Sequence, residues 1–223
     1  MGTRTGLLIT TAVAAAAVYA LMWVGYGASW GWVVRLDDAG LDWPFRYGST
    51  HPGWVMAWDV FCTVFGPMAF RLVGAVIIVV ALVRRHFRLA LFLLLTVELN
   101  GIVIQLAKII ADRPRPSSAL VYASWSSFPS GHALGVLVSV LGLLVVAWPA
   151  LRPALRRWLP IAGAVLVIAI GVGRVVLNVH HPSDVLAGWA LGYAYFVVCL
   201  VLAPPYPAVS ATDETPVALG SER

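Results

Sequence analysis

Charged side chains are scarce in this chain of 223 residues. Asp, Glu, Lys and Arg together make up 11% of the sequence, against roughly 25% in an average globular protein. Hydrophobic residues reach 61%, and the mean hydropathy is +0.88. The length alone would allow one or two soluble domains, but so few charges exclude them. The composition indicates an integral membrane protein.

Cysteine and clustered acidic residues are equally scarce. Cys62 and Cys199 lie far apart within apolar segments, and we interpret them as buried small side chains rather than zinc ligands. The sequence has no Asp/Glu cluster of the kind that holds Mg²⁺, so we expect neither a metal nor another cofactor. Outside the apolar segments no basic face with interleaved aromatic residues occurs, and nucleic acid is not an expected partner.

Long apolar stretches predict an all-α, polytopic fold with about six transmembrane helices. A span needs about 20 apolar residues. The first stretch is too long for the core of a secretory signal peptide, so we expect it to be retained as a helix. We assign the six spans to one domain over residues 1–203, and they fall near 6–27, 67–84, 88–110, 132–149, 158–178 and 184–203.

Two segments differ in composition from the spans. Residues 28–66 are amphipathic and hold half of the ten tryptophans, which predicts an interfacial loop at headgroup level. A short helix is expected at 53–65; in an alternative reading it forms one longer pair with the next span, which Gly66-Pro67 disfavours. Residues 204–223 are rich in proline, small and acidic residues, and predict a disordered cytoplasmic tail.

Arginine clusters predict the orientation. Arg84, Arg85 and Arg88 lie between two spans, and 152–157 holds three further arginines between two others. If both clusters are cytoplasmic, both termini are cytoplasmic and the other loops face outward. We therefore expect a multi-pass protein of the plasma (inner) membrane. Three short polar signatures then fall on its extracytoplasmic side.

The first signature runs from Lys108 to Pro116 and includes Arg113 and Arg115. Its prolines end the helix. The cations could be ordinary anchors that snorkel to the interface. Cations in this number are expected on the cytoplasmic side, however, and their position on the outer side favours anion binding.

The second signature, Pro129-Ser130-Gly131-His132, directly precedes an apolar helix. Backbone N–H groups at a helix start can bind phosphate, although Ser130 also suits a simple N-cap. His132 is either an interfacial polar residue or a proton donor beside the anion.

The third signature contains Arg174, His180, His181 and Asp184. An unpaired charge inside a span, such as Arg174, is usually functional. Asp184 could cap the last helix or accept the N–H of a histidine whose other nitrogen then attacks. Spacing does not choose between His180 and His181.

Glu98, Asn100 and Gln105 are polar residues in the middle of a span. They could form interhelical hydrogen bonds, or Glu98 and Gln105, on one helix face, could form a polar floor beneath the signatures. Both readings remain open at this stage, and Glu98 is not included among the catalytic residues.

Jointly, the signatures resemble the type 2 phosphatidic acid phosphatase family. Its motifs run Lys-x6-Arg-Pro, Pro-Ser-Gly-His and Ser-Arg-x5-His-x3-Asp, and they match in order across residues 108–184. The resemblance selects His180 over His181. One position departs, because Gly173 stands where the family has serine. We expect the missing hydroxyl to weaken one hydrogen bond without abolishing activity.

The resemblance implies a role for each residue. His180 would be the nucleophile that forms a phosphohistidine, Asp184 would orient it, and His132 would protonate the leaving oxygen and later activate water. The transferring phosphoryl group would be neutralised by side chains and backbone N–H groups of Lys108, Arg115, Arg174, Ser130 and Gly131. Three fixed cations can replace a metal in phosphoryl transfer, so we expect metal-independent catalysis.

The expected function is hydrolysis of a lipid phosphate or diphosphate at the outer interface, with membrane lipids as further partners. Undecaprenyl diphosphate, phosphatidate and phosphatidylglycerol phosphate are candidate substrates. One alternative is a phosphotransferase that uses an acceptor other than water. Another is a non-catalytic lipid-phosphate transporter or binding protein, which the presence of both histidines disfavours. The sequence does not indicate an oligomeric state.

Overall fold

The computed structural model describes residues 3–207, and within them it contains helices but no strands. Six stretches are long and apolar enough to cross a membrane, as expected, so the chain is a multi-pass membrane protein. The helices are α1 (Thr3–Gly27), α2 (Gly31–Gly48), α3 (Pro52–Val64), α4 (Pro67–Val83), α5 (Phe87–Leu93), a π-helical turn (Leu94–Glu98), α6 (Asn100–Ala111), α7 (Gly131–Ala147), a 3₁₀ turn (Trp148–Ala150), α8 (Pro153–Val176) and α9 (Pro182–Leu202).

Proline marks the first turn of several helices. Pro52, Pro67, Pro153 and Pro182 open α3, α4, α8 and α9. Proline is tolerated there because its missing N–H would have no intrahelical partner anyway. The spans therefore begin where the sequence places proline after a short polar segment.

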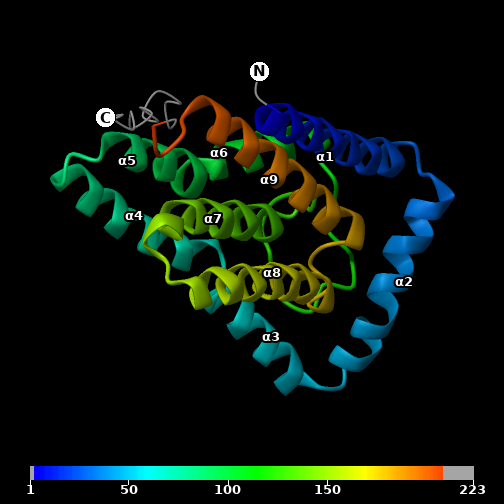
Figure 1. Ribbon diagram of the computed structural model, residues 1–223. Coiled ribbons are helices and arrows are strands. Elements are labelled where there is room, and N and C mark those ends of the chain that lie inside the picture. Colours follow the sequence, from blue (N-terminus) through cyan, green and yellow to red (C-terminus); the bar gives the residue numbers. More distant parts are fainter. Residues whose placement is uncertain (1–2, 208–223) are drawn as a thin grey trace, which may run out of the picture.

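Helix α7 lies at the centre of the bundle, against α4, α8 and α9, while α1 packs along α9 (Figure 1). Leu134, Val136 and Val138 of α7 are fully buried. Gly188 lets α9 approach closely, because a Cβ on it would lie 2.7 Å from the Ser130 carbonyl oxygen. In a membrane, helices associate through close van der Waals packing rather than through the hydrophobic effect, and small residues allow this packing.

The segment 28–66 is largely helical rather than a loop, which corrects the prediction. Helix α2 was not anticipated, because Pro44 and the polar residues of this segment suggest a loop, yet Pro44 lies inside the helix. The short helix expected at 53–65 is confirmed as α3. Together α3 and α4 make one apolar stretch, Pro52–Val83, interrupted where Gly66 caps the start of α4.

The third span is interrupted by the π-helical turn between α5 and α6. Asn100 donates to the carbonyl oxygens of Thr96 and Val97, both at 2.8 Å. Asn100 thus satisfies carbonyl groups of its own helix, and these are not the interhelical bonds considered from the sequence. π-Turns often occur at functional sites, and this one lies below the signature end of α6.

Two residues of the segment 204–207 contact the bundle, although most of the segment is exposed, and this part of the tail is therefore described rather than disordered as predicted. Pro205 is buried, and the Tyr206 hydroxyl donates to the Val146 carbonyl oxygen at 2.5 Å. The remainder of the predicted tail, 208–223, lies outside the described residues.

Candidate active site

The three polar signatures meet at one end of the bundle. They line a cavity of about 520 Å³, whose walls include Lys108, Arg115, Gly131, His132, Arg174 and His180. The arginine clusters lie in and directly after the turns between α4 and α5 and between α7 and α8, at the opposite ends of these helices (Figure 1, left). The structure therefore separates the signatures from the arginines as the sequence predicts.

Ser130 joins the second and third signatures. Its side chain caps α7 by accepting from the Ala133 N–H at 3.5 Å, and its own N–H donates to the Asp184 carbonyl oxygen at 2.9 Å. Ser130 is fully buried. Its N–H is therefore not available to a ligand. The residues of the second signature that line the cavity are Gly131 and His132.

His180 presents one ring nitrogen to the cavity and the other to a carboxylate. Its Nε2 lies 3.3 Å from an Arg115 Nη1, and its Nδ1 lies 3.6 Å from the Asp184 Oδ2. The ring is 2% exposed, and burial lowers the pKa of His180 to about 3. The imidazole is therefore neutral near pH 7, and a hydrogen on Nδ1 leaves the Nε2 lone pair directed into the cavity.

Two of the three signature cations donate hydrogen bonds to neutral groups. Lys108 donates to the Ser126 carbonyl oxygen, and Arg115 donates to the carbonyl oxygens of Ser124, Trp125 and Val179. The Arg174 Nε is buried without a hydrogen-bond partner. Between residues 3 and 207, no carboxylate lies within 4.0 Å of any of these three cations.

The proximity of the cations makes the cavity a site for an anion. Burial, and then the neighbouring Arg174, lower the pKa of Arg115. Positive charges that repel one another in a partly dehydrated cavity are stabilised when an anion binds between them. A phosphate group, which accepts several charge-assisted hydrogen bonds, has the matching chemistry.

Arg113 differs from the other cations of its signature, because it faces inward. It donates to Asp37 Oδ2 at 2.8 Å, to Asp184 Oδ1 at 2.7 Å and to the Ser183 Oγ at 2.7 Å. Its guanidinium carbon also lies 4.3 Å from the centroid of the Tyr26 ring. These partners leave Arg113 bound to the protein, so it holds Asp184 in place from behind the cavity.

Asp37 is a buried residue that the sequence analysis missed. Located on α2, it is 3% exposed and accepts from both the N–H and the Oγ of Ser183, at 2.9 and 2.7 Å. Asp37 and Arg113 thereby attach α2 to the start of α9. A carboxylate within an interfacial segment was the available signal, but several exposed acidic residues share that segment and obscure it.

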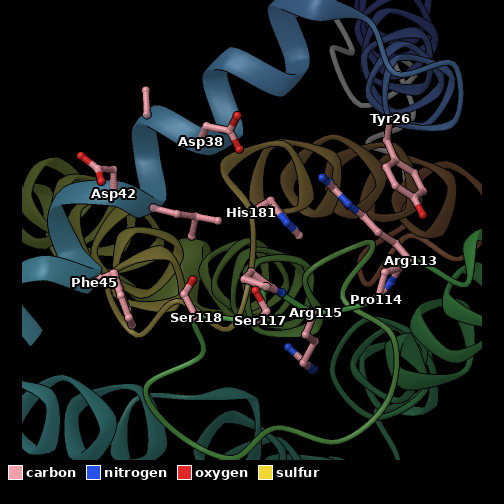
Figure 2. A pocket seen from close by; sticks show the side chains of 13 residues that line it. Tyr26, Asp38, Asp42, Phe45, Arg113, Pro114, Arg115, Ser117, Ser118 and His181 are labelled. Atoms are coloured by element: carbon pink, nitrogen blue, oxygen red, sulfur yellow. The ribbon is translucent and has the colours of Figure 1, made fainter. Parts of the chain in front are cut away.

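A second cavity, of about 770 Å³, lies on the other side of Arg115, between α2 and residues 113–118. Figure 2 shows His181, Arg113 and Arg115 around it, with Asp38 and Asp42 on the α2 side. His181 lines this cavity and His180 lines the first. The two adjacent histidines therefore line different cavities, although both rings lie beside Asp184 Oδ2, with Nδ1 at 3.2 Å for His181 and 3.6 Å for His180.

Arg71, also missed, is a fourth cation on the wall of the first cavity. It lies one turn inside α4, and an ionisable residue within a span was a signal for it. Gln105 of α6 and Asp59 of α3 line the cavity as well, whereas Glu98 is not among the lining residues. The polar floor considered from the sequence thus contains Gln105 and Arg71 rather than Glu98.

Comparisons with known proteins agree with this arrangement. The family model of the PAP2 superfamily matches residues 89–206. A solved structure titled as the first transmembrane PAP2-type phosphatidylglycerolphosphate phosphatase, from Bacillus subtilis, superimposes with a TM-score of 0.66. It covers 85% of this chain and 94% of that chain at 21% identity, which shows a shared fold.

Curated relatives match shorter regions. Phosphatidylglycerophosphatase B of Bacillus subtilis is 31% identical over 48% of this chain and 54% of its own length. An undecaprenyl-diphosphatase of Sulfolobus acidocaldarius is 38% identical over 30% of this chain and 28% of its own length. A lipid A 1-phosphatase of Rhizobium etli is 32% identical over 45% of this chain and 44% of its own length. The matches thus span about half or less of these relatives. Because the family model covers more than half of the chain, including all three signatures, the chain belongs to the PAP2 superfamily.

Proposed function

We propose that this protein is a membrane lipid phosphatase that hydrolyses a lipid phosphate or diphosphate through a phosphohistidine. One observation carries the proposal: His180 Nε2 and His132 line the same cavity as three cations that have no carboxylate partner within the described chain. The three curated relatives described above are each named as a phosphatase of a lipid, which supports the same chemistry.

The mechanism has two steps. In the first, His180 Nε2 forms a bond to phosphorus, the bond from phosphorus to the leaving oxygen breaks, and His132 gives that oxygen a proton. In the second, His132 accepts a proton from water, the water oxygen bonds to phosphorus, and the nitrogen–phosphorus bond breaks. Asp184 holds the Nδ1 side of His180 throughout, which fixes the direction of attack.

Charge on the transferring phosphoryl group is balanced by fixed groups. Lys108, Arg115 and Arg174 supply three positive charges, and the backbone at Gly131 adds the N-terminal end of α7. Ser130 contributes by joining α7 to α9, since its N–H is already used. With the charges provided by side chains, we expect turnover to need no metal.

The lipid tail would leave the cavity sideways. Residues of α3, α4 and α6 line it, and Thr63, Met68 and Gln105 among them are exposed. With the arginine-rich turns on the cytoplasmic side, the cavity faces the extracytoplasmic side of the plasma membrane. The phosphate then enters from the headgroup layer while the tail remains in the bilayer.

The test is phosphate release by the purified, detergent-solubilised protein in excess EDTA. The panel contains undecaprenyl diphosphate, phosphatidate, phosphatidylglycerol phosphate and a soluble phosphate ester. We expect free phosphate stoichiometric with lipid product, unaffected by EDTA. Transfer to another acceptor without free phosphate would indicate a phosphotransferase, and a folded protein that releases none from any lipid would indicate a binding protein.

Two neighbouring histidines provide a matched pair of variants. His180→Ala should lower turnover by at least about a thousandfold, as removal of a nucleophile does. His181→Ala loses the contact of 3.2 Å between its Nδ1 and Asp184 Oδ2 but keeps its backbone N–H bond to the same oxygen, and its ring does not line the first cavity. Its loss of turnover should therefore stay within about tenfold, far less than that of His180→Ala. Normal turnover by His180→Ala would refute the mechanism.

A further inference from the structure

The membrane-side wall of the cavity carries a cation that the proposed chemistry does not use. Arg71 of α4 lines the same cavity as His132 and His180. Its Nε is buried and has no hydrogen-bond partner. Within residues 3–207, no carboxylate oxygen lies within 4.0 Å of its nitrogens. Glu98 is near enough to interact electrostatically with Arg71 but does not form an ion pair with it, so the guanidinium remains available to an anion.

The position of Arg71 relative to the catalytic groups is fixed by α6. A Cβ on Gly101 would lie 2.5 Å from an Arg71 Nη2, so the guanidinium rests on the α6 backbone at that residue. Gly101, Gln105 and Lys108 all line the cavity, at spacings of four and three residues that share one helix face. Gly101 is about 10 Å further along the axis than Lys108, at roughly 1.5 Å per residue.

Arg71 is displaced from the attacked phosphate in the direction of the lipid tail. The attacked phosphate belongs between His180 and the three signature cations, at the outer end of α6. Arg71 and Gln105 stand further into the membrane, where the cavity is lined by α4 and α6. A group held by Arg71 would therefore lie between the attacked phosphate and the tail.

Charge on the cavity wall suits more than one phosphate. Arg71, Lys108, Arg115 and Arg174 provide four positive charges, and Asp59 provides one negative charge. A single phosphate monoester carries at most about two negative charges, and three signature cations already surround it. The fourth cation is therefore in excess for a lipid with one phosphate.

We propose that Arg71 forms a second anion subsite, which binds the phosphate nearer the lipid in a substrate that carries two phosphate groups. Gln105, one turn from Gly101 on the same face, is placed to donate to the same group. This inference rests on the proposed phosphatase activity and narrows its substrates. The second phosphate could belong to a polyprenyl diphosphate or, separated by glycerol, to phosphatidylglycerol phosphate.

The test compares kcat/KM of Arg71→Gln and wild type on four lipids. Two carry two phosphates, farnesyl diphosphate and phosphatidylglycerol phosphate, and two carry one, farnesyl phosphate and phosphatidate. We expect a loss of roughly 10- to 100-fold on at least one two-phosphate lipid, the size of a lost charged hydrogen bond. Losses on the one-phosphate lipids should stay below about threefold. The two-phosphate lipid that is affected identifies the source of the second phosphate.

Three further variants sharpen the test. Arg71→Lys keeps the charge and should recover most of the loss. Gly101→Ala leaves Arg71 present but displaces its guanidinium, and alanine suits a helix better than glycine, so it should reproduce the selective loss in a folded protein. Arg88→Gln, an exposed cation at the other end of the bundle, should change neither class of substrate.

The outcomes separate the subsite from the activity on which it depends. Wild-type protein that releases phosphate from none of the lipids overturns the proposed function itself. Active wild type with equal losses on both classes, or with no loss on either, overturns the subsite alone. Turnover of phosphatidate by each variant shows that the variant is folded.

Discussion

Cys62 of α3 occupies the space that a side chain at Gly173 of α8 would need. A Cβ built on Gly173 would lie 2.6 Å from the Cys62 Sγ and 2.9 Å from Trp58 Cε3. Both Cys62 and Gly173 are buried, and Gly173 directly precedes Arg174. The family serine is therefore absent because α3 packs onto α8 at this point. The space is filled by a sulfur atom, where the sequence suggested only a lost hydroxyl.

Gly173→Ser is expected to be destabilising because it overpacks the contact between α3 and α8. The cost should be about 1–3 kcal/mol, typical of an inserted group in a packed core, with loss of activity as Arg174 shifts. Cys62→Ala combined with Gly173→Ser should recover much of both, since it removes the opposing sulfur. Thermal unfolding in detergent and phosphate release measure these effects. Cys62→Ala alone is the control, and additive effects of the two changes would contradict direct opposition.

Asp37→Asn is expected to weaken the attachment of α2 to the active site. The substitution removes one of the two carboxylates that Arg113 binds, while Asp184 still balances its charge. The expected cost is about 1–3 kcal/mol, the size of a lost charged hydrogen bond in a buried network. Activity should fall mainly in kcat, because Arg113 also binds Asp184, which orients the nucleophile. Unfolding temperature and steady-state kinetics measure the two effects.

The same helix offers a matched control for Asp37. Asp42 pairs with Arg46 at 2.5 Å, but both side chains are more than half exposed. Asp42→Asn should therefore cost less than about 1 kcal/mol and leave kcat unchanged. Similar losses from both substitutions would show that burial of the Asp37 network has no special role.

The buried His180 predicts how stability depends on pH. Its pKa is about 3 in the folded protein, while an unfolded chain has a histidine pKa of about 6.5. Between these values the unfolded state binds a proton that the folded state does not. Stability is thus fully present above pH 6.5 and falls by up to about 1.4 kcal/mol per unit as the pH decreases.

His180→Gln removes this titration and should flatten the dependence. We expect the wild-type unfolding temperature to fall more steeply from pH 7 to pH 5 than that of the variant, at constant detergent and ionic strength. Parallel curves for the two proteins would show that His180 takes up a proton in the folded state at ordinary pH.

The sequence predicted what depends on hydropathy and local motifs, and missed what depends on tertiary contact. Six apolar stretches and three signatures placed Lys108, Arg115, Arg174 and both histidines at one end of the bundle. The sequence does not indicate how the histidine rings are oriented. It also does not indicate that His180 and His181 line two different cavities, because both properties depend on tertiary contacts. Arg113 was expected to share the role of the neighbouring cations, as an interfacial anchor or an anion ligand, although the family motif matches only Lys108 and Arg115. Only the tertiary contacts with α2 and α9 reveal Asp37 and Asp184, the two carboxylates that bind it.

Helix α2 shows why interfacial segments resist interpretation. Its residues are neither apolar enough for a span nor regular enough for a soluble helix, and Pro44 lies within it. It is held by hydrogen bonds that Ser183 donates to Asp37, and no periodicity in the sequence indicates such contacts. Arg71 was different, since a charge inside a span is itself a signal, and its nearness to Pro67 at the helix start concealed it.

The hydrogen bond from the Ser130 N–H to the Asp184 carbonyl oxygen makes the spacing of His132 and His180, the proposed acid and nucleophile, a property of the backbone. His132 follows Ser130 by two residues and His180 precedes Asp184 by four, so this one backbone contact fixes the positions of both histidines. A bulkier or longer headgroup cannot widen that gap by rotating side chains. Discrimination among lipids must then take place along the route by which the substrate arrives, and evolution can alter the preferred lipid without changing the reaction.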